Sequence, residues 1–134
     1  MSERESNAPR LRAIIADDEA FIRQVLLKML ERLGVEVVGV AENGQEAVQL
    51  YRNASPDLVI LDIAMPLMDG LEATRAILAL DPAAKILMCT SFSGKQYVLE
   101  AVKLGAKGYV NKPFDLNKIR DKIAAVCPPS VLVN

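Results

Sequence analysis

The sequence has 134 residues, of which 51% are hydrophobic and 25% charged, and its formal net charge is −1. This length and composition predict one soluble globular domain with a sizeable core, and the near-zero charge argues against nucleic-acid binding through this domain. The absence of histidine excludes histidine-ligated metal sites and triad-type hydrolases. The two cysteines, Cys89 and Cys127, match no CxxC pattern, so we expect reduced thiols in an intracellular protein.

The two ends of the sequence differ from its centre. Residues 1–9 are polar and charged and lack the apolar stretch of a secretory signal, so we expect a disordered lead-in. Residues 128–134 show no pattern and are interpreted as a tail or a truncated linker. No apolar run approaches the roughly 20 residues that a membrane span requires, and we therefore expect a cytoplasmic location. The domain itself is expected over residues 10–127.

Along residues 10–127, short apolar runs alternate with longer segments of helical periodicity. The apolar runs are typical of strands buried on both faces, and the helical segments end at glycine or before proline. In chain order the expected elements are strand Leu11–Ala16, helix 18–33, strand Val35–Val40, helix Gly44–Asn53, strand Asp57–Asp62, helix Asp69–Leu80, strand Lys85–Thr90, helix Gly94–Leu104, strand Gly108–Asn111 and helix Asp115–Val126. Five strands alternating with five helices predict an α/β fold, a doubly wound parallel sheet with right-handed crossovers.

Polar residues stand at the carboxyl ends of four of these strands. Asp17 and Asp18 follow the first strand, Asp62 ends the third, Thr90 the fourth, and Lys112 follows the fifth. Parallel strands bring these ends to one edge of the sheet. Three neighbouring carboxylates raise one another's pKa unless a cation offsets them, and oxygen ligands alone favour Mg²⁺. A lysine and a hydroxyl beside them suit a phosphoryl group.

Each of these residues alone has a structural explanation. An Asp-Asp pair before a helix commonly caps the helix and complements its dipole. A threonine at a strand end is usually structural, and a lysine before a proline is usually solvated. Independent structural causes would rarely place these residue types at the ends of strands 1, 3, 4 and 5, so the set favours a functional site.

Four segments together carry a family resemblance. Asp17-Asp18, the string DIAMPLMDG over residues 62–70, Thr90-Ser91, and the string GAKGYVNKPF over residues 105–114 resemble the receiver domain of bacterial two-component response regulators, the chemotaxis-regulator-like fold. The resemblance covers residues 10–127. It implies a flavodoxin-like, five-stranded parallel sheet of strand order 2-1-3-4-5 with five flanking helices.

The resemblance also implies a role for each acidic residue. Asp62 would be phosphorylated to an acyl phosphate. Mg²⁺ would be coordinated by Asp18, by Asp62 and by the backbone carbonyl of Ala64, while Asp17 would hold a metal-bound water. In this interpretation the apolar third strand is a rigid mount, and Asp62 is its exposed end.

The remaining site residues are implied in the same way. Thr90 and Lys112 would bind the phosphoryl group, and the Lys112–Pro113 bond would be cis, a geometry that proline makes accessible. Thr90 and Tyr109 occupy the positions of the family's switch, in which the threonine moves toward the phosphoryl group and the aromatic ring turns inward behind it. Adding nearly two negative charges at Asp62 would bias that switch.

These assignments imply a signalling function and its partners. The phosphoryl group would come from a sensor histidine kinase or a phosphotransfer protein. The readout surface would be the fourth helix, fifth strand and fifth helix, which would control a downstream partner or a fused output domain and could form a homodimer. Exposure candidates there are Lys95, Tyr97, Val98, Lys103, Lys107 and Tyr109, and core packing is the alternative for Val98 and Val102. The chain would promote its own phosphorylation and dephosphorylation without being an enzyme.

Two positions depart from the family pattern. Ala64 lies two residues after the expected phosphoacceptor, and Phe92 lies two residues after the threonine. The family often carries polar side chains at these positions, where they tune how readily water reaches the acyl phosphate. Because neither residue offers a group that could orient a water, we expect slow spontaneous dephosphorylation.

Three other functions fit these residues less well. A receiver-like docking module that no longer uses phosphate would not need the intact acceptor, metal and lysine positions. A haloacid-dehalogenase-like, Mg²⁺-dependent phosphatase would need a second aspartate where Ala64 stands. A nucleotide-binding or flavodoxin-like module would need a glycine-rich loop after the first strand, but residues 16–19 are Ala-Asp-Asp-Glu.

Overall fold

The computed structural model describes residues 10–91 and 95–127, which leaves the expected lead-in and tail outside the described residues. Its elements, in chain order, are β1 (Arg12–Ala16), α2 (Ala20–Arg32), β2 (Glu36–Ala41), α3 (Gly44–Ala54), β3 (Leu58–Asp62), α4 (Gly70–Leu80), β4 (Ile86–Ser91), α5 (Lys95–Leu104), β5 (Gly108–Lys112) and α6 (Leu116–Val126). Every strand begins and ends within one residue of its predicted bounds. The expected first residue of the fourth helix, Gly94, lies outside the described residues.

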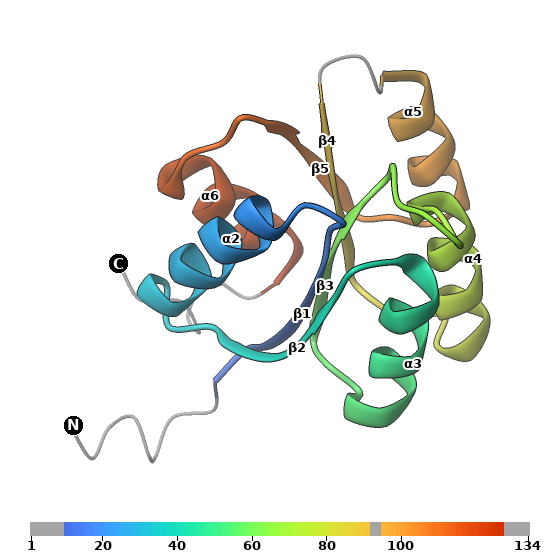
Figure 1. The fold of residues 1–134 in the computed structure, drawn as a ribbon, viewed down its shortest axis with the longest axis horizontal. Coiled ribbons are helices and arrows are strands. Elements are labelled where there is room, and N and C mark those ends of the chain that lie inside the picture. Colours follow the sequence, from blue (N-terminus) through green and yellow to red (C-terminus); the bar gives the residue numbers. More distant parts are fainter. Residues whose placement is uncertain (1–9, 92–94, 128–134) are drawn as a thin grey trace.

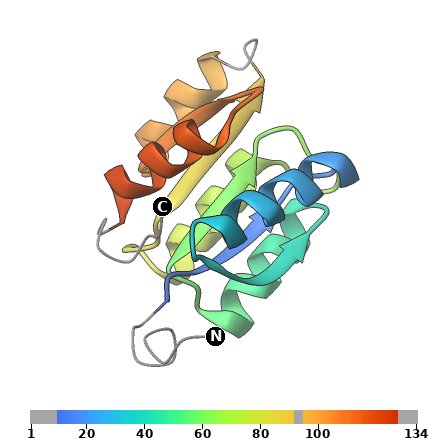
Figure 2. The same cartoon turned by 90° about the vertical axis from the view of Figure 1, so that its left-hand side faces the viewer.

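The strands form one parallel sheet of order β2-β1-β3-β4-β5. The helices cover both faces of this sheet (Figure 1), with α2 and α6 on one side and α3, α4 and α5 on the other. Figure 2 shows α2 and α6 in front of the strands. The predicted fold class and strand order are confirmed. No helix among the described residues is long and apolar enough to span a membrane.

The central strand explains why the sheet is buried on both faces. All five residues of β3 are buried. Val59 and Leu61 pack into the core under α3, α4 and α5, while Leu58 and Ile60 pack into the core under α2 and α6. Because neighbouring strand residues point to opposite faces, a continuous apolar run supplies both cores, and β3 becomes a rigid support for the residue at its end.

The turn after β3 is held by Asp69 and Gly70. The Asp69 carboxylate accepts a hydrogen bond from the Glu72 amide (2.9 Å), and the Glu72 side chain accepts one from the Asp69 amide (3.1 Å), which forms a capping box at the start of α4. The Gly70 amide donates to the Ile63 carbonyl (2.7 Å). A Cβ at Gly70 would collide with the Asp62 carbonyl oxygen, so glycine lets α4 begin directly against the end of β3.

The chain order reverses next to β1, which places a ligand crevice at the carboxyl end of the sheet. From β1 the chain passes to β2 on one side and then to β3 on the other. Open parallel sheets bind ligands at such a switch point, outside the carboxyl ends of the strands. Asp17 follows β1, and Asp62 is the last residue of β3.

Candidate functional site

Three aspartates meet at the switch point. One carboxylate oxygen from each of Asp17, Asp18 and Asp62 lies within 4.8 Å of the others. Asp17 is fully buried and Asp18 is exposed. Asp62 is only 5% exposed, so the expectation of an exposed strand end is wrong: Asp62 lies at the bottom of a cleft. Asp18, Asp62, Ala64, Thr90 and Lys112 line the same cleft, which has a volume of about 800 Å³. The structure thus brings together the acidic, hydroxyl and lysine residues that the sequence singles out.

Lys112 is the cation of this cleft. Its Nζ lies 2.9 Å from Asp17 Oδ2, 3.4 Å from Asp62 Oδ1 and 3.8 Å from Glu19 Oε1. Burial lowers the pKa of Lys112, but the hydrogen bond that the ammonium donates to Asp17 and the charges of Asp62 and Asp17 outweigh burial and raise the pKa overall. The ammonium is therefore firmly protonated. The peptide bond between Lys112 and Pro113 is cis, as the resemblance implies.

Asp62 ionises less readily than an ordinary aspartate. Burial and the negative charge of Asp17 raise the pKa of Asp62 to about 6, and Asp18 adds to the rise. The charge and hydrogen bond of Lys112 lower this pKa but do not cancel the increase. A single lysine therefore leaves the cluster short of positive charge.

Asp17 is held by backbone and side-chain groups on several sides. Its Oδ1 accepts a hydrogen bond from the Glu19 amide (2.9 Å), and its own amide donates to the Ala41 carbonyl (3.1 Å). Its Oδ2 is paired with the Lys112 ammonium, whose Nζ lies 2.9 Å away.

The donor set fits a hard divalent cation. Three carboxylates converge, a single lysine ammonium contacts two of them, and no histidine exists to compete. Oxygen-only donors of this kind suit Mg²⁺, which keeps several of its waters and takes one or two carboxylates. Asp17, Asp18 and Asp62 are the side chains that could hold it.

Thr90 completes the cleft from β4. Its side chain is almost fully buried, and Oγ1 donates to the Ser91 carbonyl (3.1 Å).

The preceding residue, Cys89, pairs with Asp62 across the β3–β4 ladder. Burial raises the pKa of Cys89 to about 12, so its thiol is inert at neutral pH, in line with the structural role expected for it.

Tyr109 lies on β5 outside the cleft. Its side chain is 39% exposed, and the Lys122 ammonium of α6 stands 5.2 Å from the ring centroid, a cation–π distance. Tyr109 therefore contacts the helix that follows β5 and does not contact the acidic cluster in this conformation.

The sequence left Val98 open between exposure and core packing, and the structure shows core packing. Val98 is only 5% exposed and packs into the core under α3, α4 and α5, together with Ala101 one turn later. The expected exposure holds for Tyr97, Lys103 and Lys107, and Val102 is exposed as well. The side chain of Lys95, and all of Phe92, lie outside the described residues.

Two charged residues beside the cluster are not predicted from the sequence. Glu19 lines the cleft and approaches Lys112. Arg23 donates from Nη1 to the Asp17 carbonyl (2.9 Å). The only signal in the sequence is their position near Asp17-Asp18, with Glu19 as the N-cap of α2 and Arg23 in its first turn.

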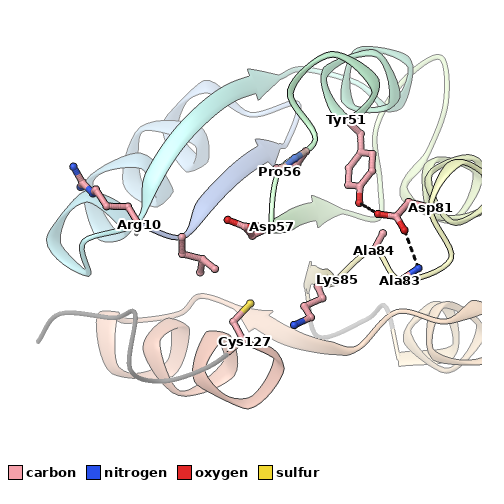
Figure 3. Close-up of a pocket in the computed structure, with 10 residues that line it drawn as sticks. Arg10, Tyr51, Pro56, Asp57, Asp81, Ala83, Ala84, Lys85 and Cys127 are labelled. Carbon is pink, nitrogen blue, oxygen red and sulfur yellow. Dashed lines mark hydrogen bonds between the residues drawn. The ribbon is translucent and has the colours of Figure 1, made fainter. Parts of the chain in front are cut away.

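A second cavity, of about 420 Å³, lies at the opposite edge of the sheet (Figure 3). Its polar groups are largely paired within the protein. The Tyr51 hydroxyl donates to Asp81 Oδ2 (2.7 Å), the Ala83 amide donates to Asp81 Oδ1 (3.0 Å), and Asp57 Oδ2 accepts from the Arg12 amide (2.9 Å).

Comparison with known proteins identifies the family. The family model described as the response regulator receiver domain matches residues 13–124. The chain belongs to this family. Among the relatives of this receiver, the chemotaxis protein CheY of Thermotoga maritima is 41% identical over 115 residues, which cover 86% of this chain and 96% of the relative.

Other comparisons agree with the receiver assignment. The chemotaxis protein CheY of Halobacterium salinarum is 44% identical over 113 residues, which cover 84% of this chain and 93% of that protein. A chain in the crystal structure of a CheX-CheY-BeF3-Mg²⁺ complex from Borrelia burgdorferi superposes with a TM-score of 0.85 at 30% identity and covers 92% of each chain. The protein is therefore a CheY-like receiver domain, a signalling module of two-component systems.

Proposed function

We propose that this receiver accepts a phosphoryl group on Asp62 with the help of Mg²⁺ and passes the signal on through α5, β5 and α6. The donor would be a sensor histidine kinase or a phosphotransfer protein. The observation that carries this proposal is the cluster of three carboxylates, two of which contact a single lysine ammonium. Such a cluster is short of positive charge and has room for a cation and an anion together.

The residues of the cleft have separate parts in the transfer. A carboxylate oxygen of Asp62 attacks phosphorus, and the bond from phosphorus to the donor's imidazole nitrogen or acyl oxygen breaks. The Lys112 ammonium and the Thr90 hydroxyl stabilise the charge on the transferred phosphoryl oxygens. Asp18, Asp62 and the Ala64 carbonyl would hold Mg²⁺, and Asp17 would hold one of its waters. When bound, Mg²⁺ neutralises the remaining charge on these oxygens.

The switch begins at Thr90. Its hydroxyl, now bonded to the Ser91 carbonyl, turns toward the phosphoryl oxygens, and the Tyr109 ring then turns inward from its exposed position beside Lys122. Tyr97, Val102 and Tyr109 are apolar and exposed on α5 and β5, so this face offers the surface for a downstream partner or for a second copy of the chain. The Borrelia burgdorferi relative, whose crystal structure contains CheX and Mg²⁺, supports both the partner and the ion.

The phosphorylated form decays slowly in this proposal. Ala64 is exposed in the cleft and carries no group that could orient an attacking water, and Phe92 is equally unable to do so. The lifetime of phosphorylated Asp62 in Mg²⁺ tests this part directly. We expect a half-life well above seconds, and a half-life of seconds would contradict the expectation.

Intact mass spectrometry after incubation with acetyl phosphate tests the proposal as a whole. We expect one addition of about 80 Da, a single phosphoryl group, which requires Mg²⁺ and is absent in Asp62→Asn. No addition to the folded wild-type protein would favour a receiver-like docking module that does not use phosphate. Continuous release of phosphate would favour a phosphatase.

A further inference from the structure

Arg23 connects the acidic cluster to the first turn of α2. Its side chain is only 17% exposed, and Nη1 donates to the main-chain carbonyl of Asp17 at 2.9 Å. Nη2 lies 3.8 Å from Glu42 Oε2, but the Glu42 side chain is 68% exposed, so this ion pair contributes little. The contact with Asp17 is the strong one, because it is short, charge-assisted and partly buried.

The Asp17 carbonyl needs such a donor because β1 has ended. The last strand residue is Ala16, and the sheet ladder no longer supplies a partner for the next carbonyl, although the Asp17 amide still bonds to Ala41. A partly buried carbonyl without a donor is costly. Among the described residues, Arg23 is the side chain found to satisfy it.

The peptide that Arg23 holds is the one between Asp17 and Asp18. The orientation of this peptide sets the directions of both Cα–Cβ bonds, and hence where the two carboxylates can point. We propose that Arg23 is a positioning residue for the magnesium site: its guanidinium fixes the Asp17–Asp18 peptide so that both carboxylates converge on Asp62. This inference rests on the proposed function, since it assumes that the cluster binds Mg²⁺.

A positioning role and a purely electrostatic role of Arg23 predict opposite changes in Mg²⁺ affinity when the side chain is removed. A positive charge next to a cation site repels the cation, so removal of a side chain that acted only by its charge would tighten Mg²⁺ binding. Removal of a side chain that orients the ligands loosens binding, and loss of such a supporting hydrogen bond typically costs 10- to 100-fold in metal affinity.

The experiment is calorimetric titration of the metal-free protein with MgCl₂. Arg23→Met removes the donor and the charge but keeps an unbranched apolar stem. Arg32→Met is the matched control, because it makes the same change at an exposed position of the same helix, about 13 Å further along the axis. Arg23→Lys restores the charge and one donor. Unfolding midpoints in chelator measure whether each variant keeps its fold.

We expect Arg23→Met to raise the Kd for Mg²⁺ about tenfold, Arg32→Met to stay close to wild type, and Arg23→Lys to recover part of the loss. The Asp17 carbonyl ¹³C shift should change in Arg23→Met, which reports the lost hydrogen bond independently. If Arg23→Met does not fold, Arg23→Gln replaces it, with the same direction expected.

Unchanged or tighter binding by the Arg23 variants would overturn the positioning role while leaving the magnesium site intact. An equal loss in Arg32→Met would overturn it as well, because the effect would then not depend on the contact between Arg23 and the Asp17 carbonyl. If the wild-type protein itself bound no Mg²⁺, the proposed function would fail together with this inference, so the two failures are distinguishable.

Discussion

The amino-terminal and carboxyl-terminal edges of the sheet both carry aspartates, and they differ in what those aspartates contact. At the amino-terminal edge (Figure 3), Asp81 accepts hydrogen bonds from the Tyr51 hydroxyl and the Ala83 amide, and Asp57 accepts one from the Arg12 amide. At the carboxyl-terminal edge, Asp17 and Asp62 face each other and share one lysine.

This difference separates structural carboxylates from functional ones. Carboxylates bonded to neutral donors of their own chain stabilise turns and helix ends and need nothing more. Buried carboxylates that face one another carry an electrostatic cost, and burial together with the charge of Asp17 raises the pKa of Asp62; an added cation relieves this cost. The residue types at a sheet edge do not distinguish the two roles. The hydrogen-bond donors that contact each carboxylate do.

The largest expected effect concerns the two lysines, one at each edge. Lys112→Met should slow phosphorylation of Asp62 by acetyl phosphate about 100-fold, since a preorganised donor to the developing charge is lost. Lys85→Met, at the amino-terminal cavity, should leave the rate unchanged. Timed intact-mass measurements compare the two variants. Equal rates for both would show that the carboxyl-terminal edge is not the reactive one.

Substitution of Asp62 should stabilise the metal-free protein, which is unusual for a buried charged residue. The pKa of Asp62 rises from 3.8 to about 6, so ionising this group at neutral pH costs up to about 3 kcal/mol. Asp62→Asn removes the charge and keeps the shape. Chemical denaturation in chelator at pH 7 should therefore give a larger free energy of unfolding for the variant. A marked decrease would contradict the charge imbalance.

The same group gives a pH dependence with a definite sign. Between about pH 4 and pH 6, the native state binds more protons at Asp62 than the unfolded state does, so stability falls as the pH rises through this window. The free-energy difference between Asp62→Asn and wild type should grow over the same window and then level off. If the difference in free energy of unfolding did not vary with pH, the stabilisation would not come from the ionisation of Asp62.

The smallest effect is expected at the amino-terminal edge. Tyr51→Phe removes the hydroxyl that bonds to Asp81 at 2.7 Å and should lower the free energy of unfolding by about 1 kcal/mol. It should not alter the Kd for Mg²⁺ or the phosphorylation rate. Denaturation and Mg²⁺ titration of the same sample check both statements, and a change in Mg²⁺ affinity would mean that the two edges are coupled.

Much of the architecture follows from local patterns in the sequence. The apolar run that ends in Asp62 predicts β3 correctly because a strand buried on both faces needs no polar residue. Asp69 and Asp115 mark helix starts because their carboxylates cap the amides at the third helical position. The convergence of Asp17, Asp18 and Asp62 follows from parallel strands alone.

Other features depend on contacts that no local pattern encodes. Val98 is buried because the orientation of α5 on the sheet decides which side of that helix faces inward, and the spacing of its apolar residues left both sides open. Arg23 looks like an ordinary surface arginine until the end of β1 places an unsatisfied carbonyl within its reach. The contact between Lys122 and Tyr109 joins a helix to a strand, so it too depends on tertiary packing.

The most direct test of the central claim is a Mg²⁺ titration of the wild-type protein followed by amide NMR. The account predicts saturation at one ion per chain, with the largest shifts at Asp17, Asp18, Asp62 and Ala64 and little change at Tyr51, Asp57 and Asp81. Shifts centred on the amino-terminal edge, or no saturable shift at all, would contradict the claim that unmatched carboxylates make the carboxyl-terminal edge a cation site.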